Sequence, residues 1–415
     1  NIIGTKEKFN KINGAVIAPQ GFEPAGIRTG VKRRRKDLAI IYTKKSAVCA
    51  GVYTTNVVKA APLLVTKDIV EKATSVNAVI INSGNANACT GAQGLTYAWS
   101  MVEKTREVLN LPQRSVLVAS TGVIGVQMQM EKILDGIEEI VTQLGSCEQS
   151  ALNAAEGIMT TDTFVKGIAY EFEISGKTVK IGAIAKGSGM IHPNMGTMLG
   201  FVTTDAVISK ELLQKALSDS TKNTYNMISV DGDTSTNDMV IVLANGCAQN
   251  KPIESENSED YKTFAKALDM VNKHLAKQIV LDGEGATKFL EVNIQGAKDE
   301  KSAKILAKSV ITSNLVKTAF FGEDANWGRI LAALGYSGIE FNPDNVSIEF
   351  CAGDKSMFLM KEGTPLEFDE DEAHELLKNK EITTNVYMGE GAFSASAWGC
   401  DLSYEYVRIN GEYRT

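Results

Sequence analysis

The stretch of this sequence best suited to unusual chemistry is 186–206, KGSGMIHPNMGTMLGFVTTDA. Glycines and a proline interrupt an otherwise apolar run, so it cannot form one regular element. Within it, Gly196 directly precedes Thr197. Because glycine has no Cβ, its peptide can be held in a strained geometry in which the neighbouring hydroxyl reaches the carbonyl carbon. An N-to-O acyl shift and hydrolysis would then leave Thr197 as a new N-terminus.

A threonine at such an N-terminus is a nucleophile that needs no histidine, because its own α-amino group takes the hydroxyl proton. The free amine has a pKa of about 8, so a useful fraction is unprotonated near neutral pH. Gly-Thr pairs are common, and an ordinary turn is the alternative interpretation of the same two residues. The pair alone therefore gives only a weak indication of this chemistry.

The chain has few histidines that could act as a catalytic base. Only three histidines are present, His192, His274 and His374. The last two lie in charged stretches with helical spacing, which leaves no obvious Ser-His-Asp arrangement. His192 lies near the Gly-Thr pair, and we expect it to have a structural or peripheral role.

Three stretches of the sequence begin or end like known cofactor or metal motifs, but none has the required residues at the required spacing. Gly176-Lys177-Thr178 ends like a phosphate-binding loop, but Glu171 stands where the first glycine is needed. A dinucleotide fingerprint beginning at Gly187 has His192 at its third glycine position. A calcium loop beginning at Asp231 would need a glutamate where Val242 stands. We therefore expect no cofactor and no metal.

Composition and charge narrow the class of protein further. The chain has 415 residues, 44% of them hydrophobic, and a net charge of −7, so nucleic acid is not expected as its main partner. Its six cysteines form no C-x-x-C pair, which indicates neither a zinc site nor a disulfide framework. No apolar run approaches the roughly 18–20 residues that a membrane helix needs, and we expect a cytoplasmic protein. The basic run 32–36, KRRRK, could hold phosphate, but a solvated loop is the favoured interpretation.

The elements that must position these residues follow a mixed α/β pattern, without internal repeats. Apolar runs rich in β-branched residues predict strands at 37–43, 46–54, 76–82 and 114–120. Helical spacing predicts amphipathic helices at 95–111, 130–144, 208–228 and 258–280. A hairpin over 168–187 turns at Ser175 and Gly176. Further strands are predicted at 239–245, 289–296, 346–353, 383–389 and 401–409.

A series of segments, in order along the chain, matches one known family. They are GFEPAGIRTGVK, VYTTNVVKAAPL, VIINSGNANACTG, ASTGVIG, GIMTTDTF, KGSGMIHPNMGTMLG, SVDGDTSTNDMV, LDGEGATK, FFGEDANWGRI and SASAWGCDLSYEYVRINGEYRT. Over nearly its whole length the sequence resembles the ornithine acetyltransferase family, the glutamate N-acetyltransferases of arginine biosynthesis. Members of that family cleave themselves just before a motif threonine. Many have alanine at the position of Gly196, and since both residues are small we expect cleavage here too.

The resemblance implies a role for individual residues. Thr197 is the implied nucleophile, in self-cleavage and in accepting an acetyl group. Thr121 and Gly122 match the family's oxyanion-hole pair, one through a hydroxyl and the other through a backbone N–H. The implied substrate-binding residues, together with Thr197, are Thr160, Lys186, Glu284, Asn410 and Thr415.

The resemblance also implies the reaction and the mature form. Acetyl passes from N2-acetyl-L-ornithine to L-glutamate through acetyl-Thr197, with small-molecule substrates and no cofactor. Some members also use acetyl-CoA as donor, and the sequence leaves this open. The implied fold layers sheets between helices and resembles N-terminal-nucleophile hydrolases. Cleavage gives an α chain, 1–196, and a β chain, 197–415, and two of each assemble.

Two other classes of protein remain alternatives at this point. An aminopeptidase or amidase would use the same threonine and release the acyl group to water. A non-catalytic binding protein would leave the chain uncut.

Overall fold

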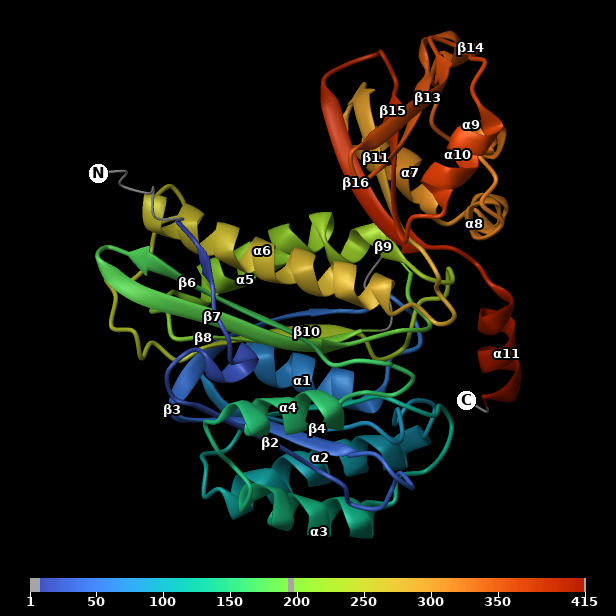
Figure 1. Cartoon of the computed structure of the whole chain (residues 1–415). Coiled ribbons are helices and arrows are strands. Elements are labelled where there is room, and N and C mark those ends of the chain that lie inside the picture. The colour runs from blue at the N-terminus through green and yellow to red at the C-terminus, as the bar shows by residue number, and fades with distance from the viewer. Residues whose placement is uncertain (1–7, 193–197, 414–415) are drawn as a thin grey trace.

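The computed structural model describes residues 8–192 and 198–413. It has a mixed α/β architecture in which sheets are layered between helices, and this confirms the predicted fold class (Figure 1). Within these residues no helix is long and apolar enough to cross a membrane.

The first sheet has nine strands in the order β1-β6-β7-β8-β10-β3-β4-β5, with β2 pairing with β3. Their bounds are β1 Asn10–Lys11, β2 Phe22–Ile27, β3 Leu38–Tyr53, β4 Val76–Asn82, β5 Val116–Ser120, β6 Lys166–Ile174, β7 Lys177–Lys186, β8 Leu199–Thr204 and β10 Met239–Ala244. The two strands predicted at 37–43 and 46–54 form the single strand β3. Its first part pairs with β2 and β4 and its last part with β10, so β3 joins the two halves of the sheet.

Helices separate and cover these two halves (Figure 1). Helices α5 (Lys210–Asn223) and α6 (Glu259–Leu281) cover the outer face of the β6–β8 half. Helices α1 (Ala61–Lys72) and α4 (Glu148–Gly157) lie between the halves, and α2 (Gly91–Val108) and α3 (Met130–Val141) cover the far side. The Thr66 hydroxyl of α1 donates to the Val118 carbonyl and accepts from its N–H, which caps the free edge of β5.

The predicted hairpin is present as β6 and β7, which pair in register from Lys166 and Ala185 to Ile174 and Lys177. Its two turn residues both have positive φ, 47° at Ser175 and 78° at Gly176, as a two-residue turn of this kind requires. The second strand, β7, ends at Lys186. Because the turn fixes the register of the hairpin, it also fixes the position of this lysine at the end of the strand.

The second sheet has seven strands in the order β14-β13-β12-β15-β11-β16-β9. Their bounds are β9 Ile228–Ser229, β11 Phe289–Ala297, β12 Ser347–Ala352, β13 Lys355–Lys361, β14 Thr364–Pro365, β15 Glu381–Tyr387 and β16 Phe393–Cys400. Four helices pack beside it, namely α7 Glu300–Ile311, α8 Asn314–Phe321, α9 Trp327–Gly335 and α10 Glu370–Leu377. Short 3₁₀ turns complete the chain at Ala15–Ile17, Tyr225–Met227 and Pro343–Asn345.

The strand predicted at 401–409 is wrong, because this segment forms helix α11 (Tyr404–Glu412). Its tyrosine, valine and isoleucine favour a strand by composition. None of its side chains is buried, however, so no sheet face selects that conformation. Arg408 instead pairs with Glu405 and Glu412, three and four residues away, which are neighbours only on a helix. Figure 1 shows α11 descending from the second sheet to lie beside the first.

Candidate active site

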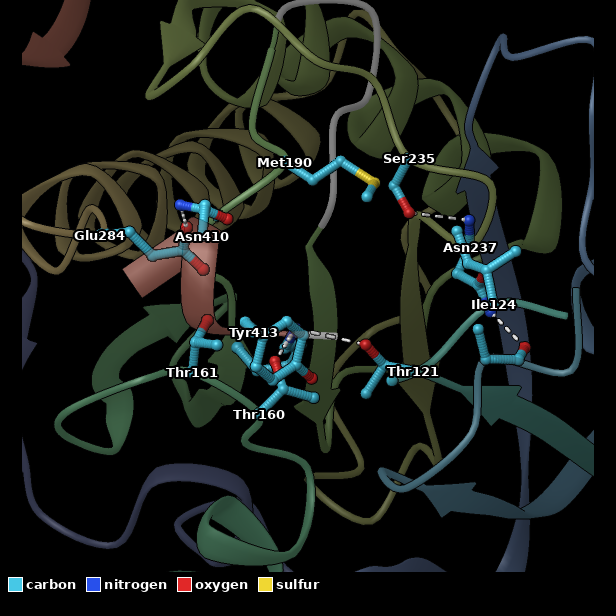
Figure 2. Close-up of a pocket in the computed structure, with 14 residues that line it drawn as sticks. Thr121, Ile124, Thr160, Thr161, Met190, Ser235, Asn237, Glu284, Asn410 and Tyr413 are labelled. Atoms are coloured by element: carbon cyan, nitrogen blue, oxygen red, sulfur yellow. Dashed lines mark hydrogen bonds between the residues drawn. The ribbon is translucent and has the colours of Figure 1, made fainter. Parts of the chain in front are cut away.

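A small cavity of about 80 Å³ lies where the ends of β5 and β7 meet the loop after α6 and the C-terminal helix α11. Six of the residues that the sequence analysis selected line it, Thr121, Gly122, Thr160, Lys186, Glu284 and Asn410. They come from five separate parts of the chain. Figure 2 shows Glu284 and Asn410 on one side of the cavity and Thr121 on the other.

Lys186 is the cation of this cavity. Its side chain is buried, and its Nζ donates to the Thr160 hydroxyl at 3.0 Å and to the Thr121 hydroxyl at 3.3 Å. Burial lowers the pKa of Lys186 below its usual value, although the carboxylate of Asp162 acts in the opposite direction. A hydroxyl that accepts a bond from this cation keeps its own proton to donate. Thr121 can therefore donate to an oxygen in the cavity while Lys186 supports it with positive charge.

Gly122 provides the second donor expected at an oxyanion site. It follows β5 with φ 129°, and a Cβ at this position would lie 2.6 Å from the backbone of Gly84, so only glycine fits. The N–H of Thr121 is used by the Asn82 carbonyl at 3.0 Å. For the Gly122 N–H, no hydrogen bond to another residue of the described ranges is seen. The backbone here can hold a negatively charged oxygen.

Glu284 and Asn410 form the acidic side of the cavity. The Asn410 side-chain amide donates to Glu284 Oε2 at 2.7 Å and to the Tyr406 carbonyl, one turn back in α11, at 3.0 Å. Glu284 is only 8% exposed. A Cβ on Gly189 would lie 2.3 Å from its carboxyl carbon, so the glycine makes room for the carboxylate. This side of the cavity suits an ammonium group.

A buried ion network supports both sides, and sequence reasoning missed it. Lys166 Nζ lies 2.6 Å from Asp162 and 2.7 Å from Asp282, with all three side chains almost fully buried. Asp162 in turn accepts from the backbone N–H groups of Thr160 at 3.1 Å and Gly187 at 2.8 Å. Burial alone would raise the pKa of Asp162, but Lys186 and Lys166 outweigh it and hold that pKa below its usual value.

The network reaches the acidic side through Ser188. Its hydroxyl donates to the Asp282 carbonyl at 2.6 Å, and its carbonyl accepts from the Glu284 N–H at 3.0 Å. No sequence motif marks these residues, because Asp162 and Asp282 are far apart in the chain. Other cavity residues that the sequence analysis did not select include Met190, Ser235, Asn237 and Tyr413.

The predicted residues Gly196, Thr197 and Thr415 lie outside the described residues. Met198 directly follows Thr197 in the sequence, and its N–H donates to Asp238 Oδ1 at 2.8 Å. Asp238 is fully buried, and its other oxygen has no partner within the described ranges. Burial raises the pKa of this carboxyl well above its usual value. His192 does not line the cavity, and its ring Nδ1 lies 3.3 Å from the Ser229 hydroxyl.

Comparison with known proteins decides the family, because the ArgJ family profile matches residues 23–415. The chain belongs to the ArgJ family. It is 52% identical to the arginine biosynthesis bifunctional protein ArgJ of Caldanaerobacter subterraneus subsp. tengcongensis over 404 residues, which cover 97% of this chain and 99% of that protein. It is 51% identical to the protein of the same name from Thermotoga neapolitana over 401 residues, 96% of this chain and 100% of that protein.

A solved structure from the family is also similar. The crystal structure of arginine biosynthesis bifunctional protein ArgJ from Bacillus halodurans is 48% identical, with a TM-score of 0.49, and covers 51% of this chain and 98% of that chain. The family match and the full-length relatives confirm the predicted family and the predicted enzyme, an ArgJ acetyltransferase of arginine biosynthesis. The alternatives of an aminopeptidase or a non-catalytic binding protein are therefore set aside.

Proposed function

We propose that this ArgJ enzyme transfers the acetyl group of N2-acetyl-L-ornithine to L-glutamate through an ester on Thr197. The observation that carries the proposal is one small cavity with Lys186 and Thr121 on one side and Glu284 on the other. Acetylornithine carries a carboxylate, an ammonium group and an acetyl carbonyl. In the cavity, Lys186 can pair with the carboxylate, Glu284 with the ammonium group, and the Thr121 hydroxyl can donate to the carbonyl oxygen.

In the first half-reaction, the Thr197 α-amine takes the proton of its own hydroxyl, and Oγ attacks the acetyl carbonyl carbon. The carbonyl oxygen becomes negative, and the Thr121 hydroxyl and the Gly122 N–H are the donors for it. When the C–N bond breaks, the amine returns the proton to the leaving nitrogen. Ornithine departs with a free α-amine, and Thr197 keeps the acetyl group.

Substrate orientation falls to the polar residues around the cavity. Lys186 and the Thr160 hydroxyl are assigned to the α-carboxylate, and Glu284 with Asn410 to the side-chain ammonium of ornithine. The terminal Thr415 is assigned to binding as well, through the family resemblance alone. The amine of glutamate then attacks acetyl-Thr197, which gives N-acetyl-L-glutamate and restores the enzyme.

The mature protein follows from the same chemistry. Cleavage between Gly196 and Thr197 creates the amine that the mechanism needs, so the active form has an α chain, 1–196, and a β chain, 197–415. Two of each make the assembly that we propose. The enzyme acts in the cytoplasm and needs no cofactor or metal, because the threonine supplies both nucleophile and base.

Steady-state kinetics test the proposal. A cavity that holds one amino acid at a time requires ornithine to leave before glutamate binds, so double-reciprocal plots should be parallel. Acetylornithine alone should release about one ornithine per site in a burst. Continued release of acetate without glutamate would instead indicate a hydrolase, and intersecting plots would indicate direct transfer between two bound substrates.

A further inference from the structure

Two consecutive buried residues at the edge of the small cavity, Asn237 and Asp238, hold chain segments from both halves of the first sheet. They directly precede β10, which pairs with β8. Asn237 is 4% exposed and Asp238 is fully buried. Figure 2 shows Asn237 on the same side of the cavity as Thr121. Neither side chain takes part in the proposed steps of acetyl transfer, so the burial of their polar groups needs another explanation.

The side-chain amide of Asn237 holds the end of the strand that leads to the oxyanion donors. Its Nδ2 donates to the Ser120 carbonyl at 2.8 Å and to the Ala86 carbonyl at 2.6 Å. Ser120 is the last residue of β5, and Thr121 follows it directly. The N–H of the peptide that joins these two residues donates to the Asn82 carbonyl at 3.0 Å. Because a peptide is planar, the bonds at its carbonyl and at its N–H fix the orientation in which the chain enters the oxyanion site.

The side chain of Asp238 holds the residue that follows the nucleophile. Its Oδ1 accepts from the Met198 N–H at 2.8 Å, and the Met239 N–H donates to the Met198 carbonyl at 3.2 Å. Both backbone groups of Met198 are therefore held by two consecutive residues. Since the Met198 N–H belongs to the peptide that joins Met198 to Thr197, Asp238 anchors the chain directly beside the nucleophile.

The segment 235–238, which carries both anchors, is itself held from β3 and by its own side chains. Thr54, directly after β3, donates its N–H to the Asp238 carbonyl at 3.0 Å and its hydroxyl to the Ser235 carbonyl at 2.8 Å. The Asn237 N–H donates to the Ser235 hydroxyl at 3.1 Å. All of these bonds are internal to the protein, so no substrate is needed to order the segment.

We propose that Asn237 and Asp238 are positioning residues that set the separation between Thr197 and the oxyanion donors. The proposal rests on acetyl transfer through Thr197. The nucleophile attacks the acetyl carbon while Thr121 donates to the oxygen of the same carbonyl, so the two groups must lie at a fixed separation. A displacement of about 1 Å between such groups can lower the rate about 100-fold. One short segment holds the peptide beside each of them, which is what this alignment requires.

The first test replaces Asp238 by alanine and by asparagine. Asp238→Ala removes the acceptor of the Met198 N–H, so kcat per cleaved chain should fall by about 10-fold to 100-fold. The KM for acetylornithine should stay within about threefold, because Lys186 and Glu284 are untouched. Burial raises the pKa of Asp238 and so favours its neutral form, which asparagine resembles. Asp238→Asn keeps an oxygen for Met198 and should retain kcat within about threefold of wild type.

The second test replaces Asn237 by alanine, with Asn245→Ala as the matched control, and it decides the matter if Asp238→Ala yields no cleaved enzyme. Asn245 is 3% exposed and directly follows the other end of β10. Like Asn237, it donates to two acceptors, the Gln20 carbonyl at 2.8 Å and the Thr43 hydroxyl at 3.3 Å. Both variants should unfold at lower urea concentrations than wild type. Only Asn237→Ala should lower kcat, by about 10-fold or more.

A double-mutant cycle separates positioning from general destabilisation. Without the Thr121 hydroxyl there is less to misalign, so Asn237→Ala should lower kcat at least about threefold less in the Thr121→Ala background than in wild type. Equal losses in the two backgrounds would overturn the proposal, and so would an equal loss of kcat in the Asn245 control.

The state of the wild-type enzyme distinguishes a failure of this proposal from a failure of the proposed function. Wild type that never gains an acetyl group on the fragment beginning at Thr197 would refute the proposed function and, with it, this role. Wild type that gains the acetyl group, together with a kcat for Asn237→Ala within about twofold of wild type, would refute the positioning role alone.

Discussion

Asn410 donates a 2.7 Å hydrogen bond to Glu284, which lies 126 residues earlier in the chain. Through this contact the C-terminal helix α11 completes a cavity whose other walls come from the first sheet and the loop after α6. The carboxylate is thereby oriented by a side chain that is itself held by the Tyr406 carbonyl. The acidic side of the site thus depends on the end of the chain.

Replacing Asn410 by alanine should raise the KM for acetylornithine, because Glu284 loses the amide that orients it toward the ammonium group. A hydrogen bond to a charged group contributes about 1.5–3 kcal/mol, so kcat/KM should fall roughly 10-fold to 100-fold. The control is Arg408→Gln, which lies on the same helix and, among residues 8–192 and 198–413, forms ion pairs with Glu405 and Glu412 alone. Equal kinetics for the two variants would remove Asn410 from the site.

Replacing Thr121 by alanine should lower kcat by roughly 100-fold to 1,000-fold, the usual loss for one oxyanion donor. Thr121→Ser keeps the hydroxyl and should restore most of the activity. Both variants should unfold at nearly the wild-type urea concentration, since the backbone bond from the Thr121 N–H to Asn82 is retained. A loss below threefold for the alanine variant would make Thr121 merely a turn residue.

Replacing Lys166 by methionine should strongly destabilise the fold. The change leaves Asp162 and Asp282 buried without their shared cation, and breaking such a buried pair costs about 3–5 kcal/mol. The free energy of unfolding in urea measures it. Lys67→Met, which breaks an exposed pair with Glu71, is the matched control and should cost less than about 0.5 kcal/mol. Similar costs for both would show that the buried network is not needed for stability.

Asp238 should make stability fall as pH rises. Burial raises the pKa of its carboxyl well above the usual value, so the folded state holds a proton that the unfolded state has lost. The free energy of unfolding therefore decreases with pH from about 4, the unfolded value, up to the raised folded value. Asp238→Asn keeps an oxygen for the Met198 N–H and should gain stability over wild type across that range. A difference between the two proteins that does not change with pH would contradict this.

Local chemistry made much of the fold predictable. The β6–β7 hairpin follows from alternating apolar residues around Ser175 and Gly176, and the long amphipathic helices follow from their apolar spacing. The helix over 404–412 was missed because its conformation depends on charge pairs and on Asn410 reaching Glu284, whereas its composition favours a strand. Periodicity also gave no sign that β3 is one strand serving both halves of the sheet.

The candidate site was predicted by family resemblance more than by local pattern. Thr121, Glu284 and Asn410 lie in segments without a general motif, and only the fold brings them together. The Asp162, Lys166 and Asp282 network escaped prediction for the same reason, since its partners meet only after the sheet and α6 have packed. A buried lysine in a strand gives no local signal of its two carboxylate partners.

The central claim is that Thr197 carries the acetyl group, and intact-mass spectrometry of the purified enzyme tests it most directly. Before substrate is added, the spectrum should show two fragments, 1–196 and 197–415, in place of the full chain. After incubation with acetylornithine and no glutamate, the fragment that begins at Thr197 should be heavier by one acetyl group, and glutamate should remove it. An active enzyme whose chain stays intact, or whose fragments never gain an acetyl group, would contradict the account.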